Sequence, residues 1–410
     1  MPAGPIDVAF CFDDHLALPG AVAILSLLET NSAVRVHVLT DPEPRAAPLL
    51  RSIARSKGAE ISIVDSAPER DHDVDTASDY GRESTATYRR VFLTELLPDL
   101  DRVLYLDADL IVRNDLRQLW EAKLAGMPVG AVTDPWMATI DSMRAAFPNG
   151  YFNAGVLLID LVRWRTERVL ERFVEDIRRR QLAGEDPLSY RSDQTPLNEV
   201  LRGRWCRLPP QWNFTGYHVP RLAAELALTA ETFAEAASDP AIVHFLGSHK
   251  PWVAGFESLT PWHREWHDLR RRLEAGFDLS GLGWPAPFTN GDASARRRRM
   301  LAMQLVQSAL EQGLEEPAVV LTGLLGSEVV HVAREQGLPI ACLASENPAY
   351  SGGRLHDVEV VTIGEALDQG RRDFILADYR RLKRSREILA SEAERRGAEL
   401  RVVALSPPFG

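Results

Sequence analysis

Short apolar runs alternate with amphipathic stretches over the first part of the chain. The runs at 6–12, 34–39 and 60–64 have the length and the β-branched content of buried strands. Between them, residues 19–29 and 46–57 carry apolar positions at helical spacing. This alternation predicts an α/β fold with a mostly parallel, doubly wound sheet.

The same kind of pattern continues to residue 276. It predicts helices at 84–97, 114–124, 161–181, 193–201 and 263–276, and strands at 103–106, 129–132, 152–159 and 241–245. The polar, acidic stretch at 66–82 lacks this periodicity, so we expect a loop there.

A second alternation follows a stretch at 280–295 whose glycines, prolines and small polar residues are typical of a linker. It predicts helices at 296–312, 323–336, 365–368 and 385–396, and strands at 318–322, 340–343, 359–362, 373–377 and 400–404. We therefore expect a first domain at 1–280, a linker at 281–299 and a smaller Rossmann-like α/β domain at 300–410.

The glycines of this second domain do not have the spacing of a dinucleotide site. Gly323 and Gly326 are separated by two leucines, whereas the dinucleotide turn has the pattern Gly-x-Gly-x-x-Gly. Glu346 follows the second strand, where a carboxylate could meet a ribose. We expect residues 300–410 to serve the structure, a protein partner or a homo-oligomer contact rather than to bind a nucleotide.

Composition excludes some classes of function. The chain has 47 basic and 58 acidic residues and a net charge of −11, which argues against nucleic-acid binding. Its three cysteines, Cys11, Cys206 and Cys342, are far apart and have no metal-ligand spacing, which favours a reducing compartment. Because no signal-peptide pattern and no apolar run of transmembrane length is found, we expect a cytoplasmic protein without a transmembrane segment.

Two carboxylates follow the predicted strand at 103–106. Since side chains alternate along an extended chain, Asp107 and Asp109 point to one side and Ala108 to the other. Neighbouring carboxylates repel each other unless a cation lies between them, and Mg²⁺ and Mn²⁺ favour oxygen ligands. The pattern predicts a metal site that holds a phosphate-bearing ligand, with a solvated acidic turn as the alternative.

Five further stretches accompany this one. They read Ala-Phe-Cys-Phe-Asp-Asp-His at 9–15, Tyr-Arg-Arg-Val-Phe at 88–92, Tyr-Phe-Asn-Ala-Gly-Val-Leu-Leu-Ile at 151–159, Asp-Gln at 193–194 and His-Phe-Leu-Gly-Ser-His-Lys-Pro-Trp at 244–252. Together with Val-Leu-Tyr-Leu-Asp-Ala-Asp at 103–109, and in this order, they resemble the retaining glycosyltransferases of family eight. That family groups bacterial galactosyltransferases and glycogenin, with the GT-A fold. The resemblance says nothing of the last third of the chain.

The resemblance implies a site and a reaction. The metal ligands would be Asp107, Asp109 and His244, and an imidazole beside two carboxylates suits Mn²⁺ better than Mg²⁺, which is the alternative. The nucleotide-sugar site would contain Cys11, Asp13, His15, Arg89, Asp107, Ala108, Asn153, Ala154, Gly247 and Lys250, and the catalytic residues would be Asp193 and Gln194. The donor would be UDP-galactose or UDP-glucose; the acceptor is left open.

The chemistry of these residues is consistent with such roles. Lys250 would neutralise the diphosphate as a point charge, aided by the backbone at Gly247. The amide oxygen of Gln194 or the carboxylate of Asp193 would lie beneath the oxocarbenium-like sugar carbon. Because an amide is a poor nucleophile, we favour front-face attack by the acceptor hydroxyl over a covalent intermediate on Asp193.

Simpler interpretations exist for several of these positions. His244 has the surroundings of a core histidine bonded to backbone, and Asp193 has the position of a helix N-cap. His263 and His267 imitate a zinc pair, but their spacing is His-Arg-Glu-Trp-His and not His-Glu-x-x-His, so we expect them to be structural.

Two other functions compete with transfer. One is a non-catalytic nucleotide-sugar sensor that acts through residues 300–410. The other is a phosphohydrolase with Asp107 as nucleophile, which would need a further acid cluster and a lysine in an order that the chain lacks. The segments at 134–150, 180–192 and 209–221 are the expected walls of the acceptor site.

Overall fold

The structure is a computed structural model that describes residues 4–41, 44–65, 85–184, 193–215, 234–236, 238–247, 249–253, 255–282, 291–321, 324–377 and 382–405. The loop expected at 66–82 and Gly323 lie outside these residues. By its internal contacts the chain divides into two compact units, Met1–Phe245 with Leu269–Pro285 and Leu246–Asp268 with Ala286–Gly410. The first domain expected at 1–280 thus does not coincide with the first unit, because residues 246–268 group with the C-terminal part of the chain.

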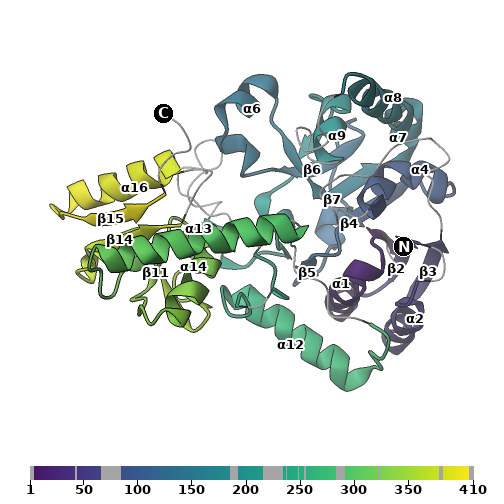
Figure 1. Cartoon of the computed structure of the whole chain (residues 1–410). Coiled ribbons are helices and arrows are strands. Elements are labelled where there is room, and N and C mark those ends of the chain that lie inside the picture. The colour runs from purple at the N-terminus through teal and green to yellow at the C-terminus, as the bar shows by residue number, and fades with distance from the viewer. Residues whose placement is uncertain are drawn as a thin grey trace. The chain divides into compact units, whose positions relative to one another are not determined.

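The first unit is built on a seven-stranded sheet with the order β3-β2-β1-β4-β7-β6-β8 (Figure 1). Its strands are β1 (Ile6–Cys11), β2 (Val34–Thr40), β3 (Glu60–Asp65), β4 (Arg102–Leu106), β6 (Val129–Thr133), β7 (Phe152–Asp160) and β8 (Cys206–Arg207). The first four are parallel, whereas β7 is antiparallel to β4 and β6. The α/β class and the mostly parallel sheet are confirmed. The apolar pattern does not reveal that β7 runs antiparallel, because a buried strand has the same apolar run in either direction.

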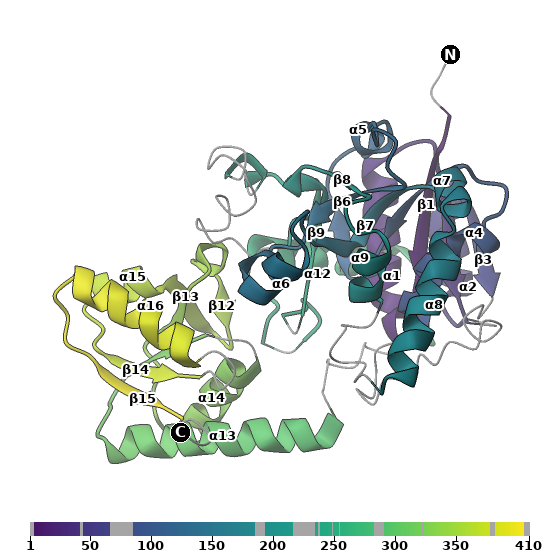
Figure 2. The same cartoon turned by 90° about the horizontal axis from the view of Figure 1, so that it is seen from above.

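Helices cover both faces of this sheet. α1 (Ala17–Thr30) and α2 (Ala47–Ser56) lie on one face, and α7 (Leu161–Thr166), α8 (Val169–Leu182) and α9 (Gln194–Val200) lie on the other (Figure 1 and Figure 2). On the second face, Phe173 of α8 and Leu197 of α9 belong to one buried core with Tyr105 of β4.

Three expected helices are shorter or broken. The helix at 161–181 is split at Arg168, whose left-handed backbone (φ 53°) cannot continue a helix. The helix at 84–97 is a 3₁₀ helix, η2 (Thr85–Phe92), followed by one turn, α4 (Leu93–Leu96), which ends before Pro98. The helix at 114–124 is reduced to α5 (Arg117–Trp120), because the carboxylate of Asp115 accepts from the N–H of Arg117 (2.7 Å) in a turn.

A two-stranded ladder completes the first unit. β5 (Leu110–Val112) pairs antiparallel with β9 (Ile242–His244), and Leu110 is opposite His244. The N–H of Phe245 also donates to the carbonyl of Asp109 (2.9 Å). The ladder therefore fixes His244 beside the turn that follows β4.

The second unit holds a six-stranded sheet with the order β12-β13-β11-β10-β14-β15. Its strands are β10 (Ala318–Val320), β11 (Leu343–Ser345), β12 (Arg354–Leu355), β13 (Val358–Thr362), β14 (Asp373–Leu376) and β15 (Arg401–Ala404). Only the β12–β13 pair of this sheet is antiparallel. α13 (Gly291–Glu311) and α14 (Leu324–Glu335) lie on one face, and α15 (Ile363–Asp368) and α16 (Leu382–Arg395) on the other (Figure 2).

Two expectations about the C-terminal part are corrected. Residues 291–299 of the expected linker are helical, and Arg299 pairs with Glu328 and Glu335 of α14, so this arginine belongs to a packed helix. The strand expected at 340–343 begins at Leu343, where it pairs with Val319 of β10. Among the described residues, no helix combines the length and apolar character needed to cross a bilayer.

Candidate active site

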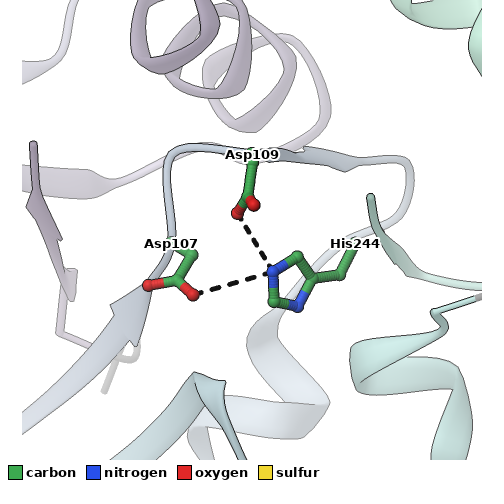
Figure 3. Close-up of side chains that lie close together, drawn as sticks. All are labelled: Asp107, Asp109 and His244. Atoms are coloured by element: carbon green, nitrogen blue, oxygen red, sulfur yellow. Dashed lines mark hydrogen bonds and ion pairs between the residues drawn. The ribbon is translucent and has the colours of Figure 1, made fainter. Parts of the chain in front are cut away.

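Asp107, Asp109 and His244 meet in space (Figure 3). Nε2 of His244 lies 3.0 Å from Oδ1 of Asp109 and 3.6 Å from Oδ2 of Asp107. One candidate ligand atom from each residue lies within 4.8 Å of the others, and within the described part of the chain this is the group that could hold a metal ion. The predicted metal ligands are thus assembled from segments that are distant in sequence.

A glycine makes this close approach feasible. The N–H of Asp107 donates to the carbonyl of Gly155 in β7 (2.8 Å). A Cβ atom at Gly155 would lie 2.1 Å from Cε1 of His244 and 2.7 Å from Oδ2 of Asp107. Glycine is therefore required at this position, because any side chain would occupy the space of two ligands.

A chain of hydrogen bonds determines the tautomer of His244. The N–H of Gly155 donates to Oδ1 of Asn153 (3.0 Å), so the Asn213 atom 2.9 Å from that oxygen is its amide nitrogen. The oxygen of Asn213 then lies 2.9 Å from Nδ1 of His244, and Nδ1 must carry the hydrogen. In the neutral ring, Nε2 presents its lone pair to two carboxylates. Such an arrangement is repulsive unless a cation lies between them, and one nitrogen with two carboxylate oxygens suits a divalent ion.

Arg90 was not predicted, although it links three parts of the site. Its Nε lies 2.9 Å from Oδ2 of Asp193, its Nη2 lies 3.2 Å from Oδ1 of Asp107, and its Nη1 donates to the carbonyl of Ala154 (2.6 Å). Burial tends to lower the pKa of Arg90, but the two carboxylates outweigh burial and raise it, so the guanidinium stays charged. Tyr105 donates to the same oxygen of Asp107 (2.6 Å).

The side-chain amide of Gln194 is held at both ends. Its oxygen accepts from the N–H of Ala154 (3.0 Å), and its nitrogen donates to Oδ2 of Asp134 (3.1 Å). Asp134 is buried and also accepts from Nδ2 of Asn153 (3.3 Å). The sequence predicts Asp134 only as part of an acceptor wall, although its position directly after the strand β6 is a signal for a site residue.

Asp193 and His244 make contacts that their simpler interpretations do not account for. Asp193 precedes α9, but its side chain makes no capping hydrogen bond and pairs with Arg90 instead. His244 is 2% exposed, like a core histidine, but its Nδ1 lies against the side-chain oxygen of Asn213 and its Nε2 faces the carboxylate of Asp109 rather than backbone.

Residues expected to contact the donor lie at the end of β1, in the turn after it and, for Arg89 of the expected sugar pocket, in η2. Cys11 is the buried last residue of β1, and burial raises the pKa of its thiol. Asp13 accepts from the N–H of His15 (2.9 Å) and caps the short helix η1 (Asp14–Leu16). Arg89 is buried and pairs with Asp41, which follows β2. Their contacts with a donor stay predictions.

Gly247 and Lys250 belong to the second unit. Gly247 has a positive φ of 64°. Lys250 is 5% exposed, and its Nζ lies 5.9 Å from the ring centre of Trp252. Their role at a diphosphate stays a prediction.

Comparison with known proteins supplies the family. Residues 7–254 match glycosyl transferase family 8. The chain is 29% identical over 258 residues to general stress protein A of Bacillus subtilis, which covers 60% of this chain and 86% of that protein. It is 30% identical over 177 residues to lipopolysaccharide 1,2-glucosyltransferase of Escherichia coli, which covers 41% of this chain and 49% of that protein.

A solved structure agrees with this match. The crystal structure of the galactosyltransferase LgtC in complex with donor and acceptor sugar analogs is similar at a TM-score of 0.53 and 26% identity, over 65% of this chain and 96% of that chain. The family match covers more than half of the chain and includes the assembled acids and imidazole. The chain therefore belongs to glycosyl transferase family 8, a family of glycosyltransferases with nucleotide-sugar donors.

Proposed function

We propose that the protein transfers a hexose, galactose or glucose, from a UDP-sugar to an acceptor hydroxyl, with retention of the anomeric configuration and with Mn²⁺ as its metal. The observation that carries the proposal is the group of Asp107, Asp109 and His244. The similarity to a galactosyltransferase and to a glucosyltransferase supports a hexose as the transferred sugar.

A divalent ion bound there would supply positive charge close to the leaving diphosphate. Lys250 contributes a second positive charge to the same leaving group and stabilises the transition state more than the ground state, since charge on the diphosphate grows as the glycosidic bond breaks. Arg90 balances the negative charge of Asp107 and Asp193, because its buried guanidinium pairs with both.

In the proposed reaction, the side-chain oxygen of Gln194 lies beneath the sugar carbon. A carbonyl oxygen has two lone pairs, so the bond from the N–H of Ala154 leaves one for the developing positive charge. The acceptor hydroxyl attacks from the face that UDP leaves, and its proton passes to the departing phosphate. Asp193 is bonded to Arg90, which lowers its power as a nucleophile and favours this front-face route over a covalent intermediate.

The decisive experiment incubates the protein with a panel of sugar nucleotides, with and without Mn²⁺, and measures the release of the nucleotide and the anomer formed. We expect metal-dependent UDP release from UDP-galactose or UDP-glucose. Asp109→Asn should reduce that turnover by at least about 100-fold while circular dichroism stays unchanged, because the Asp109 side chain is 18% exposed. Tight binding of the nucleotide-sugar without turnover, even with glycan acceptors, would instead support a sensor.

A further inference from the structure

Part of the second unit surrounds the residues next to Lys250. We call residues 249–253 and 255–259 the lysine segment. The N–H of Arg354, in the edge strand β12, donates to the carbonyl of Ser258 (3.0 Å) and forms an antiparallel bridge. The hydroxyl of Tyr350 lies 3.1 Å from Nδ1 of His249. Tyr350, which precedes the edge strand, and Arg354 within it are therefore bonded to opposite ends of the lysine segment.

Two glycines allow the lysine segment and residues 350–356 to approach each other closely. A Cβ atom at Gly353 would lie 1.9 Å from the carbonyl oxygen of Leu259, and one at Gly255 would lie 2.3 Å from Cε1 of His356. Gly255 also has a positive φ of 91°, which disfavours other residues. Contacts this close leave no room for alternative packing, so the lysine segment and residues 350–356 adopt their conformations together.

The first turns of α12 (Pro261–Gly276) hold the same segment. Nε2 of His263 donates to the carbonyl of His249 (3.0 Å), and Nε2 of His267 donates to the carbonyl of Pro251 (2.8 Å). These carbonyls belong to the residues on either side of Lys250. Because carbonyls only accept, both Nε2 atoms carry hydrogens, which agrees with the structural role expected for this pair.

The side chain of Lys250 is itself confined. Its ammonium faces the ring of Trp252, which packs on Trp266 of α12 with ring centres 5.4 Å apart. The N–H of Val253 donates to the carbonyl of Lys250 (3.0 Å) and closes a turn. A lysine has much conformational entropy to lose on binding, so a protein that orders it beforehand gains affinity.

We propose that the C-terminal sheet is a positioning element for Lys250. Residues 350–356 and the start of α12 hold the lysine segment so that the ammonium is ordered before the donor diphosphate binds. This inference rests on the proposed function, in which Lys250 binds that diphosphate. The last third of the chain then supports the binding of the donor and does not bind a nucleotide of its own.

The test uses the full chain and measures the dissociation constant of UDP by calorimetry with saturating Mn²⁺. Tyr350→Phe removes one hydroxyl, and we expect it to weaken UDP binding by about 3- to 10-fold. Gly353→Ala forces residues 350–356 away from Leu259, and we expect a loss of more than about 10-fold. Neither change should alter the affinity for Mn²⁺ alone, whose ligands lie in the first unit.

A double-mutant cycle separates positioning from general stability. In a Lys250→Ala background, Tyr350→Phe and Gly353→Ala should cause no further loss of UDP affinity, because they act through the missing ammonium. Gly370→Ala is the matched control: it strains a turn (φ 83°) in the same unit, has nothing within 4 Å of its Cβ position, and should retain wild-type UDP affinity.

Three results would overturn the proposal: folded variants that bind UDP like wild type, equal losses in the Lys250→Ala background, or the same loss in Gly370→Ala. If Gly353→Ala fails to fold, Tyr350→Phe decides. Failure of the proposed function looks different: wild type would then not bind UDP, or would bind the nucleotide-sugar without turning it over. If wild type binds UDP and Lys250→Ala binds it equally well, the assignment of Lys250 is wrong and the positioning role is wrong with it.

Discussion

The side-chain oxygen of Asn213 lies 2.9 Å from Nδ1 of His244 and makes that nitrogen the protonated one. Nε2 is thereby directed to Asp107 and Asp109 as an electron-pair donor. Asn213 is 2% exposed, so water cannot easily replace it in this role.

Asn213→Ala should therefore weaken Mn²⁺ binding by about 10- to 100-fold, because the ring loses the partner that fixes its tautomer and orientation. Paramagnetic resonance of free Mn²⁺ measures this directly. Asn213→Asp is the matched variant, since it keeps an acceptor for Nδ1–H and should retain more of the affinity. Equal affinities in wild type and Asn213→Ala would show that the hydrogen bond does not tune the metal group.

Gly155→Ala should abolish the metal group without a general loss of structure. The added methyl group would fall 2.1 Å from His244, so the imidazole must move away from the carboxylates. We expect calorimetry to show saturable Mn²⁺ binding by wild type and none by Gly155→Ala. Gly276→Ala is the control, because nothing lies within 4 Å of its Cβ position.

Arg90→Met should destabilise the first unit strongly. It leaves the buried Asp193 and the adjoining Asp107 without their common cation, and breaking a buried ion pair typically costs about 3–5 kcal/mol. Urea unfolding measures the change in the free energy of unfolding. The surface pair of Arg202 with Glu199 provides the comparison, because Arg202→Met should cost at most about 1 kcal/mol. Similar losses in both variants would contradict the role assigned to Arg90.

His263 should make the protein sensitive to mild acid. Burial lowers the pKa of this histidine from 6.5 to about 3. Between these values the unfolded chain binds a proton that the folded chain does not, so the free energy of unfolding falls as the pH falls, by about 1.4 kcal/mol per pH unit. In His263→Gln this contribution to the slope should disappear between pH 6.5 and 4, as measured by urea unfolding at several pH values. An unchanged slope would show that His263 is protonated in the folded state.

The sequence allowed the metal group to be predicted, but not the residues around it. Asp107 and Asp109 are two positions apart after an apolar strand, so their common direction follows from backbone geometry. Asn213 and Arg90 act through partners that are distant in sequence. In the 3₁₀ helix η2, successive side chains point about 120° apart, and nothing in Tyr-Arg-Arg-Val-Phe indicates which arginine turns toward Asp107.

The fold, too, could be predicted from the sequence only in part. Apolar periodicity predicted most strands, because each run reports its own burial. It gave no information on the reversal of β7 or on the grouping of residues 246–268 with the C-terminal sheet, since both depend on non-local packing. The stretch expected as a linker overlaps α13, because α13 begins among small and charged residues and its buried positions, such as Leu305 and Val306, come later.

The third ligand of the metal group enters the chain late, on β9, whereas the two acids and Gly155 precede it. During synthesis, strands β1 to β7 leave the ribosome well before His244, and folding generally proceeds from the N-terminus. A nascent chain at that stage has two carboxylates and no imidazole, a ligand set that suits Mg²⁺ as well as a transition metal. An ion held by all three residues would therefore bind only after β9 has paired with β5.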